Sequence, residues 1–193
     1  MSVVVFEDFI EKPDKLEVRS GSAGTPQRVD GAGGIIEIPT SASQNSWTQM
    51  QSRSRFITAR HAPVVTAFLR SKDYASSQEI FVGLADGEAG SSPDMIGFYR
   101  SDGANAGTWR CRTKAAGVGN GDVDSGFLGD LQEVELALAA SPLEVTFLVN
   151  GRVVHVEKTN IPTALMRVVL WIKTTTSAVR TLAVDYIGVL GGR

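Results

Sequence analysis

The sequence is poor in the residues on which most metal and disulfide chemistry depends. The chain of 193 residues contains one cysteine, Cys111, so no internal disulfide and no cysteine-rich zinc site can form. Its two histidines, His61 and His155, leave little for a histidine-based metal centre. Aromatic residues make up only 7% of the chain, which is low for a dedicated carbohydrate-binding module. These shortages make most kinds of catalytic chemistry improbable.

Neither charge nor hydrophobicity is concentrated enough to suggest a nucleic acid or a membrane as the partner. The 19 Lys and Arg residues nearly balance the 21 Asp and Glu residues, whereas a nucleic-acid binder usually has a basic excess. No run of about 18 apolar residues is present, and the first residues lack the basic start and small-residue cleavage site of a secretory signal. We therefore expect a protein that is made in the cytoplasm and contacts neither nucleic acid nor membrane.

What the chain has in quantity is β-branched residues and turn formers. Its 21 Val, 10 Ile and 14 Thr suit a pleated surface better than a helix. The 20 Gly and seven Pro punctuate these residues, as is typical of many short strands. The stretch 128–140 contains helix formers but also alternates from Glu133 to Leu138, so we interpret it as a strand. The pattern predicts an all-β protein with a two-sheet antiparallel jelly-roll sandwich over residues 31–193.

Two segments give more detailed predictions. Asn150-Gly151 stands between two alternating runs and predicts a type I′ hairpin turn, because both residues tolerate a positive φ. In the run 107–113, Trp109 shares a face with Cys111, so Trp109 is predicted to lie in the core.

Alternation in the final strand groups Leu182, Val184 and Tyr186 on one face. Asp185 falls on the other face. It is expected at a strand edge or in a turn contact, and not as a buried charge in the core.

The first thirty residues differ from the rest and are interpreted as an N-terminal arm. Two short apolar runs lie among turn-forming sequences such as Lys12-Pro13-Asp14 and the segment 21–26. Such an arm can dock on a neighbouring subunit by adding a strand, and the alternative is a flexible terminus. The expected anchors are the apolar residues of the arm: Val3, Val4, Val5, Phe6, Phe9 and Ile10.

Residues 31–190 resemble the concanavalin A-like, LamG-type jelly rolls. The resemblance depends on the order of several short motifs along the chain, each of them weak alone: Phe81-Val-Gly-Leu-Ala-Asp86, Ile96-Gly-Phe-Tyr99, Trp109 before Asp124-Ser-Gly126, Val145-Thr-Phe-Leu-Val-Asn-Gly151, Thr159-Asn-Ile-Pro-Thr163 and Leu182-Ala-Val-Asp-Tyr-Ile-Gly-Val189. It implies the two-sheet fold and says little about function.

Relatives of this fold include glucanases with carboxylates spaced as Glu-x-Asp-x-x-Glu on one strand, so that alternate side chains point into the cleft. The nearest strings here are Phe6-Glu-Asp-Phe-Ile-Glu11 and Glu133-Val-Glu135, and the second lacks the third acid. No Gly-x-Ser-x-Gly nucleophile elbow is present, and both histidines are interpreted as ordinary loop or strand residues. We therefore expect no enzymatic activity.

Calcium is the one cofactor that the sequence suggests, since some LamG-like domains bind it. Asn120, Asp122 and Asp124 offer oxygen ligands at alternate positions, which hard cations prefer. The segment lacks the glycine and distant glutamate of an EF-hand loop, and an ordinary turn is the alternative.

Trp171 is the leading candidate for binding a glycan or a protein partner. Alternation places it on one face with Arg167, Val169 and Lys173. The opposite, more apolar face has Val168, Leu170 and Ile172. A tryptophan among cations suits stacking on a sugar or on a neighbouring subunit. The alternative is a tryptophan covered by loops.

These expectations favour a non-enzymatic structural protein of a bacteriophage particle, such as a capsid decoration or tail-associated protein. The resemblance supports this, because similar jelly rolls occur in phage particle proteins. We expect localisation in the virion after synthesis in the host cytoplasm, other virion proteins as partners, and a homo-oligomer such as a trimer. The alternative is a carbohydrate-binding module or adhesin for a host-surface glycan, and a third reading is a divergent glycoside hydrolase or lyase.

Overall fold

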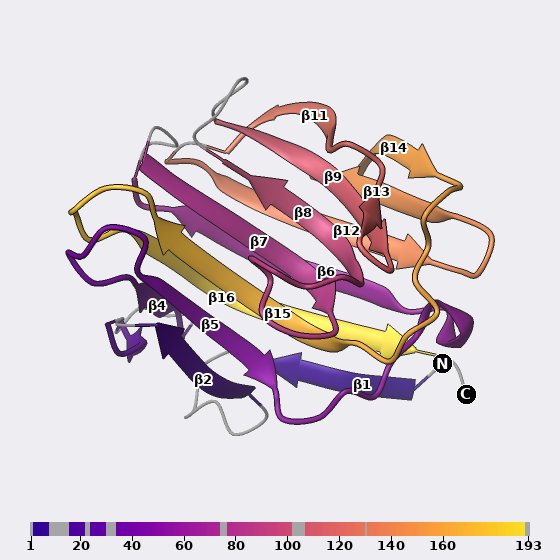
Figure 1. Cartoon of the computed structure of the whole chain (residues 1–193), viewed down its shortest axis with the longest axis horizontal. Helices are drawn as coiled ribbons and strands as arrows, with labels where there is room; N and C mark the ends of the chain where they lie inside the picture. Colours follow the sequence, from indigo (N-terminus) through magenta and orange to yellow (C-terminus); the bar gives the residue numbers. More distant parts are fainter. Residues whose placement is uncertain are drawn as a thin grey trace.

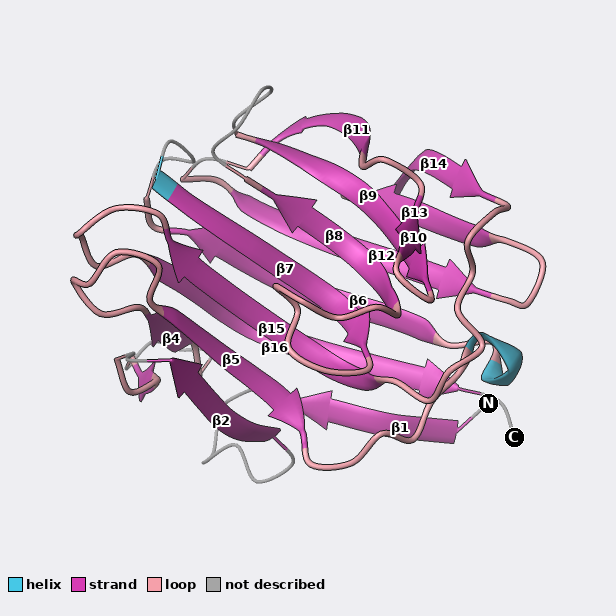
Figure 2. Cartoon of the chain, viewed as in Figure 1, coloured by secondary structure: helices cyan, strands magenta, loops and turns pink. Residues whose placement is uncertain are grey.

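Two antiparallel β-sheets of eight strands each lie face to face in the computed structural model (Figure 1, Figure 2). No helix among the described residues is long and apolar enough to cross a membrane, and the named helix is a 3₁₀ turn, Ala59–His61. The structure describes residues 2–7 (backbone), 16–21, 24–29, 34–73, 77–101, 107–129 and 131–191.

The first sheet has the order β14-β13-β12-β6-β16-β4-β3, and β1 pairs with β16 beside this path. Its strands are β14 (Arg152–Glu157), β13 (Val145–Val149), β12 (Glu133–Ala140), β6 (Val64–Ser71), β16 (Thr181–Gly191), β4 (Ile36–Pro39), β3 (Gln27–Arg28) and β1 (Ser2–Glu7).

The second sheet has the order β10-β9-β8-β7-β15-β5-β2, with β11 paired to β9. Its strands are β10 (Val118–Gly119), β9 (Thr108–Ala115), β8 (Met95–Arg100), β7 (Gln78–Ala85), β15 (Arg167–Thr174), β5 (Trp47–Ser52), β2 (Leu16–Gly21) and β11 (Val123–Leu128). The predicted all-β, two-sheet antiparallel fold is confirmed.

The core lies between the sheets and is built by alternate residues of nearly every strand. Trp109 and Cys111 are both fully buried in it, as the alternation of β9 predicts. Phe98 of the second sheet meets Phe147 of the first edge-on, with ring centroids 5.3 Å apart. Such contacts join the two layers and bury their apolar faces from water.

The predicted hairpin is present between β13 and β14. Asn150 and Gly151 have φ values of 50° and 73°, as a type I′ turn requires. Val149 pairs with Arg152 directly across the turn. The stretch interpreted as a strand rather than a helix is β12.

The predicted faces of the last strand are right only up to Val184. The pairing of β16 with β6 shifts between Val184 and Tyr186, which marks a β-bulge. Beyond it the buried residue is Ile187, and Tyr186 faces outward beside Phe68. The extra residue reverses the alternation, which strict periodicity does not foresee. Asp185 lies at the bulge and outside the core, where it lines a surface hollow.

The described strands of the N-terminal segment pair with strands of both sheets, and the division into an arm and a jelly-roll domain stays a prediction. β1 pairs with β16, β2 with β5 and β3 with β4, so their main-chain hydrogen bonds are made within the chain. The C-terminal half of β16 has an open side beyond β4, and β1 fills it. For the expected anchors Val3, Val4, Val5 and Phe6 the structure describes only the backbone, while Phe9 and Ile10 lie outside the described residues.

Candidate functional site

The outer face of the second sheet presents the residues that the sequence singles out. Trp171 lies opposite Gln49 on β5 and Phe81 on β7. Arg167 and Lys173 occupy the two ends of β15 on this face, while alternate residues of the strand point into the core. The predicted sharing of one face by these residues is therefore correct.

The loop joining β7 to β8, residues 86–94, covers the centre of this face (Figure 1). Its Ala89 packs into a second apolar cluster that includes Phe81, Met95 and Trp171. Trp171 is consequently only 1% exposed. It offers no exposed stacking platform, and the alternative interpretation, a tryptophan covered by a loop, describes its position. The side-chain alternation of a strand cannot reveal that a loop returns over its outer face.

Gln49 fixes this loop to the sheet. Its Nε2 donates to the carbonyl of Gly87 at 3.2 Å, and its Oε1 accepts from the backbone N–H of Ala89 at 3.0 Å. At the other end of the loop, Lys114 Nζ donates to the carbonyl of Ser92 at 3.1 Å. Because Gln49 is itself buried, its bond to Ala89 is shielded from water and helps to hold the loop in place.

Beside the covered centre lies a row of partly exposed side chains, which we call the aromatic strip: Trp47, Lys173, Glu79 and Tyr99. In the sheet register Lys173 is opposite both Trp47 and Glu79. The Lys173 Nζ lies 3.7 Å from Glu79 Oε1, and the two side chains are 27% and 22% exposed. The strip thus combines indole and phenol groups with one cation and one carboxylate on a rigid sheet surface.

The two aromatic residues of the strip differ in what they offer. Arg112 covers the Tyr99 ring, with its guanidinium carbon 3.5 Å from the ring centroid. Burial, with the negative charge of Glu79 adding to it, raises the pKa of Tyr99 to about 12, so the hydroxyl stays protonated. The Trp47 ring instead lies against β2, where a Cβ at Gly21 would be 2.5 Å from its Nε1. The Trp47 ring fits against β2 because residue 21 is a glycine and has no side chain.

The three predicted calcium ligands are used by other groups of the protein. Asp122 receives two hydrogen bonds from Arg112, with the Nε to Oδ1 distance at 2.5 Å. Asn120 donates to Glu157 at 2.9 Å, and Asp124 accepts from the backbone N–H of Gly126 at 2.8 Å. Within the ranges that the structure describes, no three His, Cys, Asp or Glu residues are grouped as a metal site requires. Calcium binding stays a prediction.

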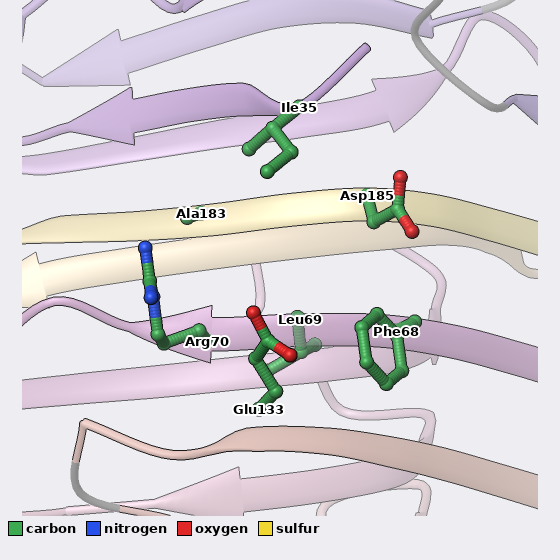
Figure 3. Close-up of a pocket in the computed structure, with 7 residues that line it drawn as sticks. All are labelled: Ile35, Phe68, Leu69, Arg70, Glu133, Ala183 and Asp185. Carbon is green, nitrogen blue, oxygen red and sulfur yellow. The ribbon is translucent and has the colours of Figure 1, made fainter. Parts of the chain in front are cut away.

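A hollow of about 260 Å³ lies on the outer face of the first sheet (Figure 3). Arg70, Glu133 and Asp185 are its charged lining residues, and Phe68 forms part of its wall. Glu133 is directly opposite Arg70 in the register, and Figure 3 shows Asp185 across from Phe68. Phe68 stacks on Tyr186 with ring centroids 6.1 Å apart. The remaining lining residues are Ile35, Leu69 and Ala183.

Sequence reasoning missed this hollow because it sought acids on a single strand. Glu133 comes from β12, and Asp185 reaches the same hollow from the bulge of β16, with β6 between the two strands. The order of strands in a sheet is not readable from spacing along the chain, so no sequence signal pairs these two carboxylates.

The two histidines take part in local structure. His61 Nδ1 accepts from the backbone N–H of Thr58 and closes the 3₁₀ turn. The His155 ring stacks on Phe147 at 6.1 Å, and its Nε2 is 3.5 Å from the Glu157 carboxylate. Both positions agree with their interpretation as ordinary loop and strand residues.

Neither the protein-family models nor the curated protein sequences gave a match to this chain. Solved structures of similar shape include a native glycosidic hydrolase (TM-score 0.72, 13% identity, 98% of each chain covered). A β-glucanase of Bacillus licheniformis has a TM-score of 0.71 at 14% identity, over 98% of this chain and 97% of that one. The potassium-bound carbohydrate recognition domain of Emp46p has a TM-score of 0.68 at 11% identity, over 97% and 96%.

These similarities establish the fold as a concanavalin A-like jelly roll, as the sequence resemblance implies. They also correct the expectation that the chain is not an enzyme. A glycosidic hydrolase and a β-glucanase share this fold over nearly their whole length, and a carbohydrate recognition domain shares it as well. The fold therefore gives no ground for excluding catalysis.

Proposed function

We propose that the protein binds carbohydrate through the aromatic strip on the outer face of the second sheet. The observation that supports this most directly is the Lys173–Glu79 ion pair between the partly exposed Trp47 and the hydroxyl of Tyr99. Sites for small ligands combine apolar or aromatic surface with a few fixed polar groups, and this row has both. The similar fold of a carbohydrate recognition domain is consistent with the proposal.

Trp47, Lys173 and Glu79 each have a definite part in this proposal. The Trp47 ring supplies apolar surface for the C–H face of a sugar, while its position against Gly21 limits its movement. Lys173 donates hydrogen bonds to sugar hydroxyls, and Glu79 accepts them. The cross-strand pairing fixes both groups before the ligand arrives, which reduces the entropy lost on binding.

A glycan array followed by calorimetry on the best ligand tests the proposal. We expect Trp47→Ala and Lys173→Met each to weaken binding by about tenfold, the equivalent of about 1.4 kcal/mol. Lys72→Met is the matched control, because Lys72 forms a similar ion pair with Glu37 on the first sheet. Full binding by both strip variants would contradict the proposal.

A second candidate function, glycoside hydrolysis, is favoured by the hollow on the first sheet. Glu133 and Asp185 line it from two strands, and no hydrogen bond or ion pair occupies either carboxylate among the described residues. Glycosidases commonly use a pair of carboxyl groups that flank the scissile bond. Release of reducing ends from β-glucans should then fall at least about a hundredfold in Glu133→Gln and in Asp185→Asn. The exposed Glu144→Gln is the control, and the absence of turnover by the wild type would reject this candidate.

Attachment to a phage particle, with virion partners and a homo-oligomer, stays a prediction. A carbohydrate-binding protein on a particle surface would act as an adhesin for host glycans, so the two readings are compatible. Sedimentation of the purified protein with particles would test the attachment, and analytical ultracentrifugation would give the oligomeric state.

A further inference from the structure

At the far end of β15, Arg167 and Arg19 contact one glutamate of β2, and the charge of a third arginine acts on Arg167. Arg167 Nη1 is 3.6 Å from Oε1 of Glu17, and Arg19 Nε is 3.2 Å from the same oxygen. Gln51 also donates to this oxygen, at 2.5 Å. A single carboxylate oxygen of Glu17 therefore forms ion pairs with two guanidinium groups.

The third arginine, Arg55, is brought to this place by an irregular pairing. The backbone N–H of Phe56 donates to the carbonyl of Met166 at 3.0 Å, so the chain at Arg55 runs beside the start of β15. Arg55 is exposed, and no ion pair or hydrogen bond engages its guanidinium among the described residues. It therefore adds positive charge without a compensating partner.

The electrostatic balance at Arg167 shows that this positive charge is in excess. Burial lowers the pKa of Arg167, and the charges of Arg55 and Arg19 lower it further, ahead of the opposite effects of Glu17 and Asp86. Repulsion by the two neighbouring cations thus ranks above attraction by the two neighbouring acids. An additional anion at this point would relieve the repulsion.

Arg167 also has an unused hydrogen-bond donor. Its side chain is only 12% exposed, and its buried Nε has no hydrogen-bond partner among the described residues. A buried donor without an acceptor is costly, and the planar guanidinium fork is suited to a bidentate oxyanion. The Nε is therefore an unsatisfied donor next to the excess of positive charge.

We propose that Arg167, Arg55 and Arg19 bind the sulfate or carboxylate group of an acidic polysaccharide. This deepens the proposed function, because it names an anionic class of glycan for the same sheet face. Lys173 of the aromatic strip and Arg167 are six residues apart on β15, which is about 20 Å at the rise of a β-strand. A polymer is long enough to contact both places, whereas a single sugar is not.

A set of dextrans with one backbone and different charges tests the inference. Unmodified dextran, carboxymethyl-dextran and dextran sulfate are each titrated into the full-length protein at two salt concentrations. We expect at least one charged dextran to bind about tenfold more tightly than the neutral polymer, with an affinity that falls as salt rises. Comparison of the two charged polymers distinguishes a carboxylate ligand from a sulfate ligand.

Variants then assign the binding to the arginines. Arg55→Gln removes an exposed residue and should weaken binding of the charged dextran by about fivefold or more. Arg167→Gln should abolish the preference for charge, provided that circular dichroism shows the variant folded. Arg152→Gln is the matched control, because it removes the same charge from an exposed position on the first sheet. The control should bind like the wild type.

Two results would overturn the inference. The first is that the wild type binds the three dextrans equally well. The second is that Arg55→Gln and Arg152→Gln lose the same affinity for the charged dextran, since an equal loss would reflect the net charge of the protein alone. Failure of the proposed function would give another result. Trp47→Ala would then bind every glycan as the wild type does, while Arg55→Gln would still have a reduced affinity for the charged dextran. In that case the arginines form an anion site without the aromatic strip.

Discussion

Gly90 lies against the indole ring of Trp171, where a Cβ at position 90 would be 3.2 Å from Cζ2 of the tryptophan. The contact closes the loop 86–94 onto the outer face of the second sheet. The buried indole Nε1 of Trp171 has no hydrogen-bond partner among the described residues. The loop therefore excludes water from this face without satisfying the one polar group of the ring that it covers.

The first prediction concerns the fastening of this loop. Gln49→Leu removes the hydrogen bonds to Gly87, Ala89 and Gln51, leaving the buried N–H of Ala89 unpaired. We expect the free energy of unfolding to fall by about 2 kcal/mol. Loosening of the loop should also increase acrylamide quenching of Trp171 fluorescence. The measurement is made in a Trp47→Phe background, so that the buried Trp109 and Trp171 are the remaining indoles.

The exposed Gln132→Leu is the control for this substitution, because it makes the same chemical change outside the loop. It should leave both the stability and the quenching unchanged. If Gln49→Leu lowers the stability without any change in quenching, Gln49 supports the sheet but does not hold the loop.

The strands could be predicted from the sequence more completely than the sites. Alternation places Trp109 in the core and shows which residues share a face with Trp171, since the period of a strand is two. It does not show what covers an outer face, and the loop that buries Trp171 comes from another part of the chain. It also fails at the bulge near Asp185, where one extra residue reverses the faces. Sites made by several strands were therefore the least predictable part.

The second prediction concerns the hairpin turn between β13 and β14. Gly151 has a φ of 73°. An alanine at this φ would be strained, because it has a Cβ, whereas glycine is not. Gly151→Ala should lower the free energy of unfolding by about 1 kcal/mol, measured by chemical denaturation. Gly87→Ala is the control, because a Cβ there meets nothing within 4 Å. Equal stability of the two variants would contradict the assigned turn.

A third prediction follows from the buried thiol. Burial raises the pKa of Cys111 to about 12, with the charge of Asp124 adding to it. Since the thiolate is the reactive form, Ellman's reagent at pH 8 should not react with the folded protein. The unfolded protein in guanidinium should react with one equivalent, because the chain has one cysteine. Rapid stoichiometric reaction in native buffer would show that the core between the sheets opens.

The last prediction concerns the Glu157 carboxylate, which joins β14 to the turn at Asn120. Burial by itself would raise the pKa of Glu157, but hydrogen bonds from Thr159, Asn120 and His155 outweigh it and hold the pKa at about 2. Among these bonds, the Thr159 hydroxyl donates at 2.6 Å and Asn120 Nδ2 at 2.9 Å. The folded state thus binds a proton at Glu157 less readily than the unfolded state does.

Because the pKa of Glu157 is lower in the folded state, its charge stabilises the protein at pH values above the unfolded-state pKa, near 4.5. This contribution to the free energy of unfolding is lost as the pH falls toward 2. Glu157→Gln should reduce the free energy of unfolding at pH 7 by about 1.5–3 kcal/mol, since it removes charge-assisted hydrogen bonds. The difference in the free energy of unfolding between wild type and variant should decrease steadily from pH 5 to pH 2 in urea titrations. The exposed Glu144→Gln should not differ from the wild type in this way. A difference that stays constant over this range would mean that the packing of Glu157, and not its charge, provides the stability.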